Sequence, residues 1–177
     1  MKKLILTLLV VAAGMAVEVN AQEPTRREIR REEREATRAG RQVAFERFVD
    51  SLVMSQSFRF LPRSFQMMPA GRRRQISNPN FRVQLFPSFV DVHMPFYYGR
   101  TPPFVISVIN RSIPSPRGML FEQREGGWEV SFESHMFTSG NHRFRFSIDS
   151  VTGDCRLTVD SPFHNRVVYS GIITGMN

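Results

Sequence analysis

The sequence predicts a mainly β fold of the α+β class. An N-terminal amphipathic helix is expected to precede about eight or nine antiparallel strands, arranged as a meander barrel or a two-layer sandwich. Apolar residues follow a helical period up to about residue 56 and a two-residue period after it. Short segments containing Gly, Asn and Asp separate the alternating runs, which is typical of antiparallel hairpins.

The first residues have the pattern of a secretory signal. Two lysines are followed by an apolar run over residues 4–16, which is too short to span a bilayer comfortably. Small residues precede the expected cleavage site between Ala21 and Gln22, and the first residue after it is not a cysteine. We therefore expect a signal peptide over residues 1–21 and a periplasmic or secreted product without a transmembrane segment or lipid anchor.

The chain after the expected cleavage site divides into a charged arm and one domain. Residues 22–40 alternate arginine and glutamate at helical spacing and contain few apolar residues, which predicts a solvated helical arm. Residues 41–56 have a broad apolar face that includes Phe48 and Leu52, which predicts a helix docked on a sheet. We expect a single β-rich domain over residues 41–177 that includes this docked helix.

Strand patterns are clearest in the C-terminal half. Phe144, Phe146 and Ile148 alternate with polar residues, and so do Leu157 and Val159. Trp128 and Phe132 follow the same rule, so all of these side chains should be buried. The segment 111–116 contains two prolines and interrupts the meander, so we expect a flexible loop or a sheet crossover there.

Several motifs occur in an order that resembles the DUF4251 family of exported Bacteroidetes proteins of unknown function. The best-marked motifs are Pro-Phe-Tyr-Tyr-Gly-Arg and a closing Tyr-Ser-Gly. The segments that carry the resemblance are residues 57–60, 72–76, 80–81, 94–100 and 168–172. The resemblance covers essentially the whole chain after the signal. It implies an exported, one-domain, β-rich protein and no particular catalytic residues.

No metal or cofactor site is predicted. The four histidines, His93, His135, His142 and His164, are scattered and lack metal-ligand spacing. Asp91 and His93 share one face of a predicted strand, but no third ligand is visible nearby, so we interpret them as an exposed polar face. The lone Cys155 is expected to be a buried strand residue.

Standard catalytic motifs are also missing from the sequence. There is no nucleophile elbow, phosphate loop or His-Glu-x-x-His motif, so an enzyme is not favoured. The alternative that remains open is a small envelope-polymer hydrolase or lyase that uses Glu129, Glu133 and Asp149, should these carboxylates converge.

One aromatic segment is a candidate ligand-binding patch. Consecutive aromatic residues cannot all face one side of a strand, so Tyr97 or Tyr98 is expected to face solvent beside Arg100. Gly99 between them would allow the backbone to bend and a ligand to approach.

The charge and aromatic content favour a noncatalytic exported binding or interaction module of the bacterial envelope. The formal net charge is +8, and every basic residue after the signal is arginine, which suits anionic lipid head groups, acidic glycans or acidic protein surfaces. Nucleic acid is not expected in this compartment. A third alternative is a structural envelope protein whose helix pairs with a partner through a thin stripe of Ile29, Ala36 and Val43.

Overall fold

The computed structural model describes residues 25–134 and 142–176. The predicted signal peptide with Ala21 and Gln22, the first residues of the predicted arm, and His135 lie outside the described residues. Contacts divide the chain after Ala39 into residues 1–39 and residues 40–177.

The described part of the first unit is the beginning of helix α2 (Arg26–Met54). Thr25 caps this helix: its Oγ1 accepts from the backbone N–H of Glu28 at 3.4 Å. Glu28 Oε2 in turn accepts from the backbone N–H of Thr25 at 2.6 Å, which completes a capping box. The side chains from Arg26 to Ala39 are exposed, as their Arg/Glu composition predicts.

In the second unit, the end of α2 docks on the sheet through Val49 and Val53, which are 1% and 0% exposed. Asp50 lies between them and accepts hydrogen bonds from Trp128 Nε1 at 2.8 Å and Ser150 Oγ at 2.9 Å. The expectation that Phe48 faces the core is wrong, because Phe48 is 48% exposed. The hydrogen bonds of Asp50 hold the helix in a rotation that buries the valines.

Ten antiparallel strands form one sheet in the order β5-β4-β3-β1-β10-β9-β8-β7-β6, with β2 paired to β1. They are β1 (Phe58–Met67), β2 (Arg74–Gln75), β3 (Arg82–Leu85), β4 (Phe89–Tyr98), β5 (Val105–Pro114), β6 (Arg117–Arg124), β7 (Gly127–Ser134), β8 (His142–Asp149), β9 (Asp154–Asp160) and β10 (Val167–Thr174). The predicted mainly β fold with an N-terminal helix is therefore confirmed.

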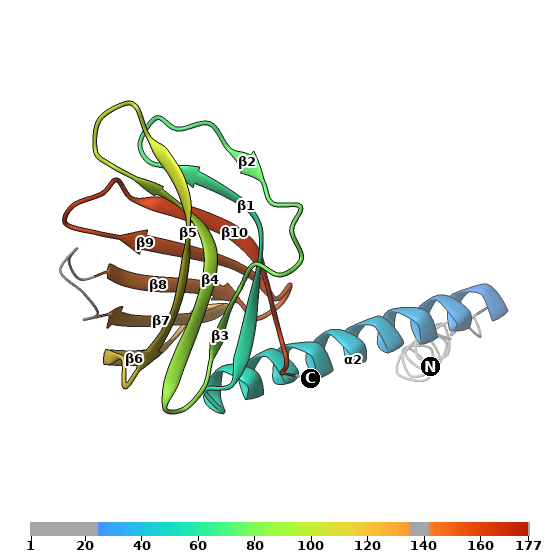
Figure 1. The fold of residues 1–177 in the computed structure, drawn as a ribbon. Helices are drawn as coiled ribbons and strands as arrows, with labels where there is room; N and C mark the ends of the chain where they lie inside the picture. Colours follow the sequence, from blue (N-terminus) through green and yellow to red (C-terminus); the bar gives the residue numbers. More distant parts are fainter. Residues whose placement is uncertain (1–24, 135–141, 177) are drawn as a thin grey trace, which may run out of the picture. The chain divides into compact units, whose positions relative to one another are not determined.

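The sheet curls into a half-barrel, with β4 and β5 crossing in front of β7 to β10 (Figure 1). Contacts of β4 with β10 and with β8 join these layers. The Tyr169 hydroxyl on β10 donates to the carbonyl of Pro95 on β4 at 2.6 Å, and the ring of Phe96 lies 5.6 Å from that of His142 on β8. One curled sheet thus forms both walls of the core.

The predicted crossover occurs between β5 and β6. These strands lie at opposite edges of the sheet, yet only Ser115 and Pro116 separate them in the chain. Ser115 has a φ of 51°, so the backbone changes direction here. The proline segment is a tight corner between two edge strands and not a long loop.

The inner face of the sheet carries the alternating apolar residues. Phe132, Phe144, Phe146, Leu157 and Val159 are at most 2% exposed, which confirms the predicted register. The expectation that Trp128 is buried is wrong: it is half-buried at the rim, where its indole N–H reaches Asp50. The core is aromatic: the Phe146 ring contacts Phe58 and Phe60 edge-on, at 5.9 and 5.8 Å.

Two strands were not predicted, β2 and β6. β2 has two residues, both exposed. In β6 the apolar residues 119–121 are consecutive, so the sequence shows no alternation. β6 is an edge strand with a register shift against β7, and such a strand does not need a strict inward-outward pattern. Edge position, which only the topology decides, removes the burial pattern that identifies a strand.

Replacing both Val49 and Val53 by alanine should lower the free energy of unfolding by about 2–4 kcal/mol, because buried methyl groups are removed from the core. The matched control replaces Val43 and Met54 by alanine. These side chains are 46% and 70% exposed on the same helix. It should change stability by less than about 0.5 kcal/mol. Urea denaturation measures both, and equal losses would show that the helix docks through another face.

Candidate functional site

A continuous row of polar residues crosses the outer face of the sheet. Successive strand pairings align Ser64 with Ser170, Ser170 with Arg156, Arg156 with Ser147, and Ser147 with Glu129. Gln75 on β2 and Glu122 on β6 extend the row at its two ends. The row is roughly 30 Å long, since neighbouring strands lie about 4.8 Å apart.

Most of this row lies in a groove of about 700 Å³, which we call the arginine groove. Four arginines line it: Arg63, Arg73, Arg124 and Arg156. They come from β1, from the segment before β2, from β6 and from β9. Sequence reasoning missed the groove because outward arginines on separate strands give no common signal until the strand order is known.

Three of the arginines define a cationic half. Arg73 Nε donates to Ser64 Oγ at 2.8 Å. The exposed Arg63 and Arg156 form no ion pair with any other residue that the structure describes. Arg63 lies at a register shift between Pro62 and Ser64, where a bulge turns an extra side chain outward. This half of the groove presents guanidinium groups that are available to an anion.

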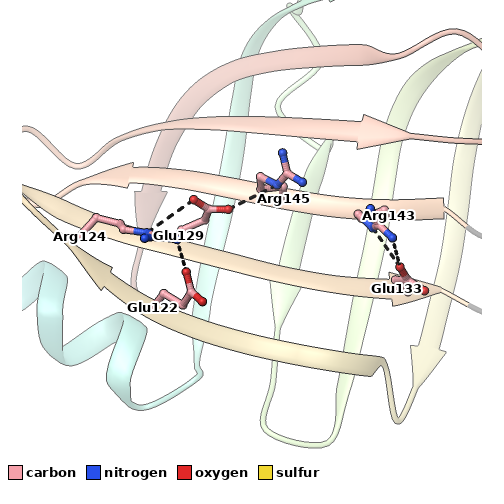
Figure 2. Close-up of polar contacts among 6 residues, drawn as sticks. All are labelled: Glu122, Arg124, Glu129, Glu133, Arg143 and Arg145. Carbon is pink, nitrogen blue, oxygen red and sulfur yellow. Dashed lines mark hydrogen bonds and ion pairs between the residues drawn. The ribbon is translucent and has the colours of Figure 1, made fainter.

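The other half is an ion-pair network on β6, β7 and β8 (Figure 2). Glu129 lies between Arg145 at 3.4 Å and Arg124 at 3.8 Å, and Arg124 also contacts Glu122. These pairs are largely solvent-exposed, so each contributes little to stability. Their effect is to neutralise this end of the row. The lining of the whole groove carries four arginines and four carboxylates, those of Glu125, Glu129, Asp149 and Asp154. The lining arginines that form no ion pair with a described residue are Arg63, Arg73 and Arg156.

The closing Tyr-Ser-Gly segment connects the core to the groove. Tyr169 is fully buried, Ser170 points into the polar row, and Gly171 pairs with Pro62. A Cβ on Gly171 would lie 2.1 Å from the carbonyl oxygen of Leu61, so only glycine fits between these strands. Burial raises the pKa of Tyr169 well above its ordinary value, so its hydroxyl keeps the proton that it donates to Pro95.

The predicted aromatic patch does not line the arginine groove. Tyr97 is 6% exposed and packs on Phe65 at 5.2 Å, so it belongs to the core and not to the surface. Tyr98 is half-buried, with its ring 5.1 Å from that of His164. Arg100 is exposed and donates to the carbonyl of Pro162. Phe96 and Tyr97 are both buried because this end of β4 is covered on both faces.

The patch is tied to the loop between β9 and β10. His164 Nδ1 accepts from the backbone N–H of Gly99 at 3.1 Å, and Asn165 donates to the carbonyl of Arg100 at 3.0 Å. Burial lowers the pKa of His164 below its ordinary value, and the positive charge of Arg100 lowers it further. The neutral ring is the form that can accept from Gly99, so these contacts favour a structural role for the segment.

Asp91 and His93 do lie on one face, as predicted. Both line a separate hollow of about 610 Å³, and the His93 ring packs on Phe81 at 5.2 Å. Within residues 25–134 and 142–176, no three His, Cys, Asp or Glu side chains are grouped to hold a metal ion. Cys155 is buried, and burial raises the pKa of its thiol well above the ordinary value.

The predicted carboxylates are only partly brought together. Glu129 and Asp149 both line the arginine groove, whereas Glu133 lies about 13 Å from Glu129 along β7, at ~3.3 Å per residue. Glu133 forms its own ion pair with Arg143, at 2.6 Å (Figure 2). Asp149 accepts from the backbone N–H of Thr152 at 2.8 Å. These carboxylates therefore already have partners in the structure.

The fold defines a small β-rich domain built on one curled antiparallel sheet with a docked helix. The chain belongs to the DUF4251 family, a domain of unknown function, whose model matches residues 41–173. It is also similar to the crystal structure of a DUF4251 family protein from Bacteroides eggerthii, with 12% identity and a TM-score of 0.57 over 76% of this chain and 91% of that chain. At this identity the likeness shows the fold alone. No curated protein matches the chain.

Lowering the pH should destabilise the protein partly through His164. Because its folded pKa is depressed, the unfolded state binds the proton more readily, and stability is lost as the pH falls below the unfolded value of about 6.5. His164→Asn keeps an acceptor for Gly99 but does not titrate, so it should lose less stability between about pH 7.5 and about pH 5. Urea denaturation across this range measures the free energy of unfolding of the unchanged protein and of the variant. The same pH dependence in both would contradict the role assigned to His164.

Proposed function

We propose that this protein is an exported, noncatalytic binding module of the bacterial envelope that holds an anionic ligand in the arginine groove. The observation that carries the proposal is the convergence of Arg63, Arg73 and Arg156 from three separate segments onto one groove. None of these three guanidinium groups has an ion-pair partner among the residues described.

The chemistry of the lining favours carboxylate, sulfate or phosphate groups. A guanidinium group presents a planar fork of donors that matches such anions in bidentate fashion. The hydroxyls of Ser64, Ser147 and Ser170 add donors and acceptors between the charges. An acidic glycan or another anionic envelope component is therefore the ligand class that we propose.

Export is supported by the sequence. The first 21 residues have the pattern of a signal peptide, and the similar solved structure comes from a Bacteroides species. In the described residues, no helix is long and apolar enough to cross a membrane. On the signal-peptide pattern of the first 21 residues we propose a periplasmic or secreted protein of a related bacterium.

The hydrolase or lyase alternative gains no support from the groove. Glu129 is in contact with Arg124 and Arg145, and Asp149 holds a backbone amide. A glycosidase mechanism needs one carboxyl group that donates a proton and a second that faces the reacting carbon. The two groove carboxylates named by the sequence analysis, Glu129 and Asp149, are instead in use as partners of neighbouring residues.

Removing two of the groove arginines should weaken polyanion binding. We expect the protein to be retained on immobilised dextran sulfate and not on uncharged dextran, and Arg73→Gln with Arg156→Gln should lower the affinity about tenfold or more, because charge-assisted hydrogen bonds are lost. Surface plasmon resonance at several salt concentrations measures the change. Retention should also fall as salt rises.

The matched control is Arg82→Gln with Arg143→Gln. It removes the same charge from outward positions on β3 and β8 that do not line the arginine groove. This control should bind dextran sulfate nearly as well as the unchanged protein. Equal weakening in both double variants would mean that net charge and not the groove attracts the polyanion, and the proposal would fail.

A further inference from the structure

A second groove, of about 900 Å³, lies between the end of α2 and the ends of β1 and β10. We call it the apolar groove, because its walls carry large apolar side chains: Phe45, Phe48, Leu52, Ile172, Ile173 and Met176. Phe45 and Phe48 are 40% and 48% exposed, with ring centroids 6.4 Å apart. The groove therefore presents apolar surface that no described part of this unit covers.

The apolar groove continues into the arginine groove. Arg63 and Asp154 line both of them. Along β10, Thr174 and Ile172 line the apolar groove, and Ser170, the next outward residue, lines the arginine groove. One ligand lying along the outer face of β10 would therefore contact apolar side chains at one end and guanidinium groups at the other.

The charges near the junction favour an anion. Two arginines, Arg59 and Arg63, and one carboxylate, Asp154, line the apolar groove. The Nε of Arg59 is buried and has no hydrogen-bond partner in the described residues. Arg59 pairs with Thr174, at the end of the apolar groove away from the junction. An acidic group placed at the junction would instead meet Arg63 and, beyond it in the arginine groove, Arg73 and Arg156.

We propose that the natural ligand is an anionic amphiphile, with a phosphate or carboxylate head in the arginine groove and an alkyl chain in the apolar groove. This inference rests on the proposed function and narrows its ligand from any polyanion to an acidic lipid. It commits to a lipid chain because the two grooves are continuous and the guanidinium groups of Arg63, Arg73 and Arg156, which form no ion pair with a described residue, lie where the apolar lining ends.

Alkyl phosphates below their critical micelle concentrations test the alkyl-chain site. In isothermal titration calorimetry, inorganic phosphate should bind weakly, and affinity should rise from butyl to hexyl to octyl phosphate. Each fully buried methylene strengthens binding by up to about fourfold. Affinity that does not depend on chain length would overturn the proposal.

Variants in the apolar groove locate the chain. Phe48→Ser should weaken octyl phosphate binding about tenfold, because it removes a wall of the apolar groove, and leave dextran sulfate retention unchanged. Met54→Ser is the matched control, since Met54 is 70% exposed on the same helix and does not line the groove. Equal effects of the two variants on octyl phosphate would overturn the placement. Both side chains are largely exposed, so both variants should fold.

The outcomes separate this inference from the proposed function. Arginine-dependent retention on dextran sulfate without any gain from the alkyl chain would leave the proposed function standing and defeat the amphiphile. Loss of the arginine-dependent retention together with the dependence on chain length would defeat the proposed function and the amphiphile. Size-exclusion chromatography tests the competing occupant: a dimer that Phe48→Ser dissociates, with octyl phosphate having no effect, would assign the apolar groove to a second copy and overturn the proposal.

Discussion

The aromatic layer between the two walls of the curled sheet is the interaction on which the rest of the structure depends. β4 can cross β8 and β10 because Phe96 packs near His142 and the Tyr169 hydroxyl satisfies the carbonyl of Pro95. Curling buries the inner face of a single sheet against itself, so no second sheet is needed to form a core. The outer face is left free for polar side chains, and both grooves lie there.

The same backbone serves stability and the candidate site through the alternation of strand side chains. On β10, Tyr169 points into the core while Ser170 points into the arginine groove, and Gly171 allows β1 to approach closely. On β9, Cys155 and Leu157 are buried around the outward Arg156. The inner rows hold the strands in register, and the register places the outward arginines and serines in one row.

Helix α2 closes one end of the core and also shapes the surface. Val49 and Val53 are buried, whereas Phe45 and Phe48, on a neighbouring face of the helix, form a wall of the apolar groove. The hydrogen bonds of Asp50 with Trp128 and Ser150 set the rotation of the helix, so the valine face docks and the phenylalanine face stays at the surface. The apolar face seen in the sequence is thus shared between docking and an exposed groove.

The sequence by itself determined the fold class and the inward residues of the C-terminal strands, because apolar residues that repeat every two positions show which face of a strand is buried. It also identified the family through the order of its motifs, and the family model over residues 41–173 agrees. Only the tertiary structure decided that Tyr97 is buried, that Phe48 is half-exposed, and that Arg63, Arg73 and Arg156 share a groove. The physical reason is that strand order and helix rotation depend on contacts between residues far apart in the chain, which periodicity does not encode.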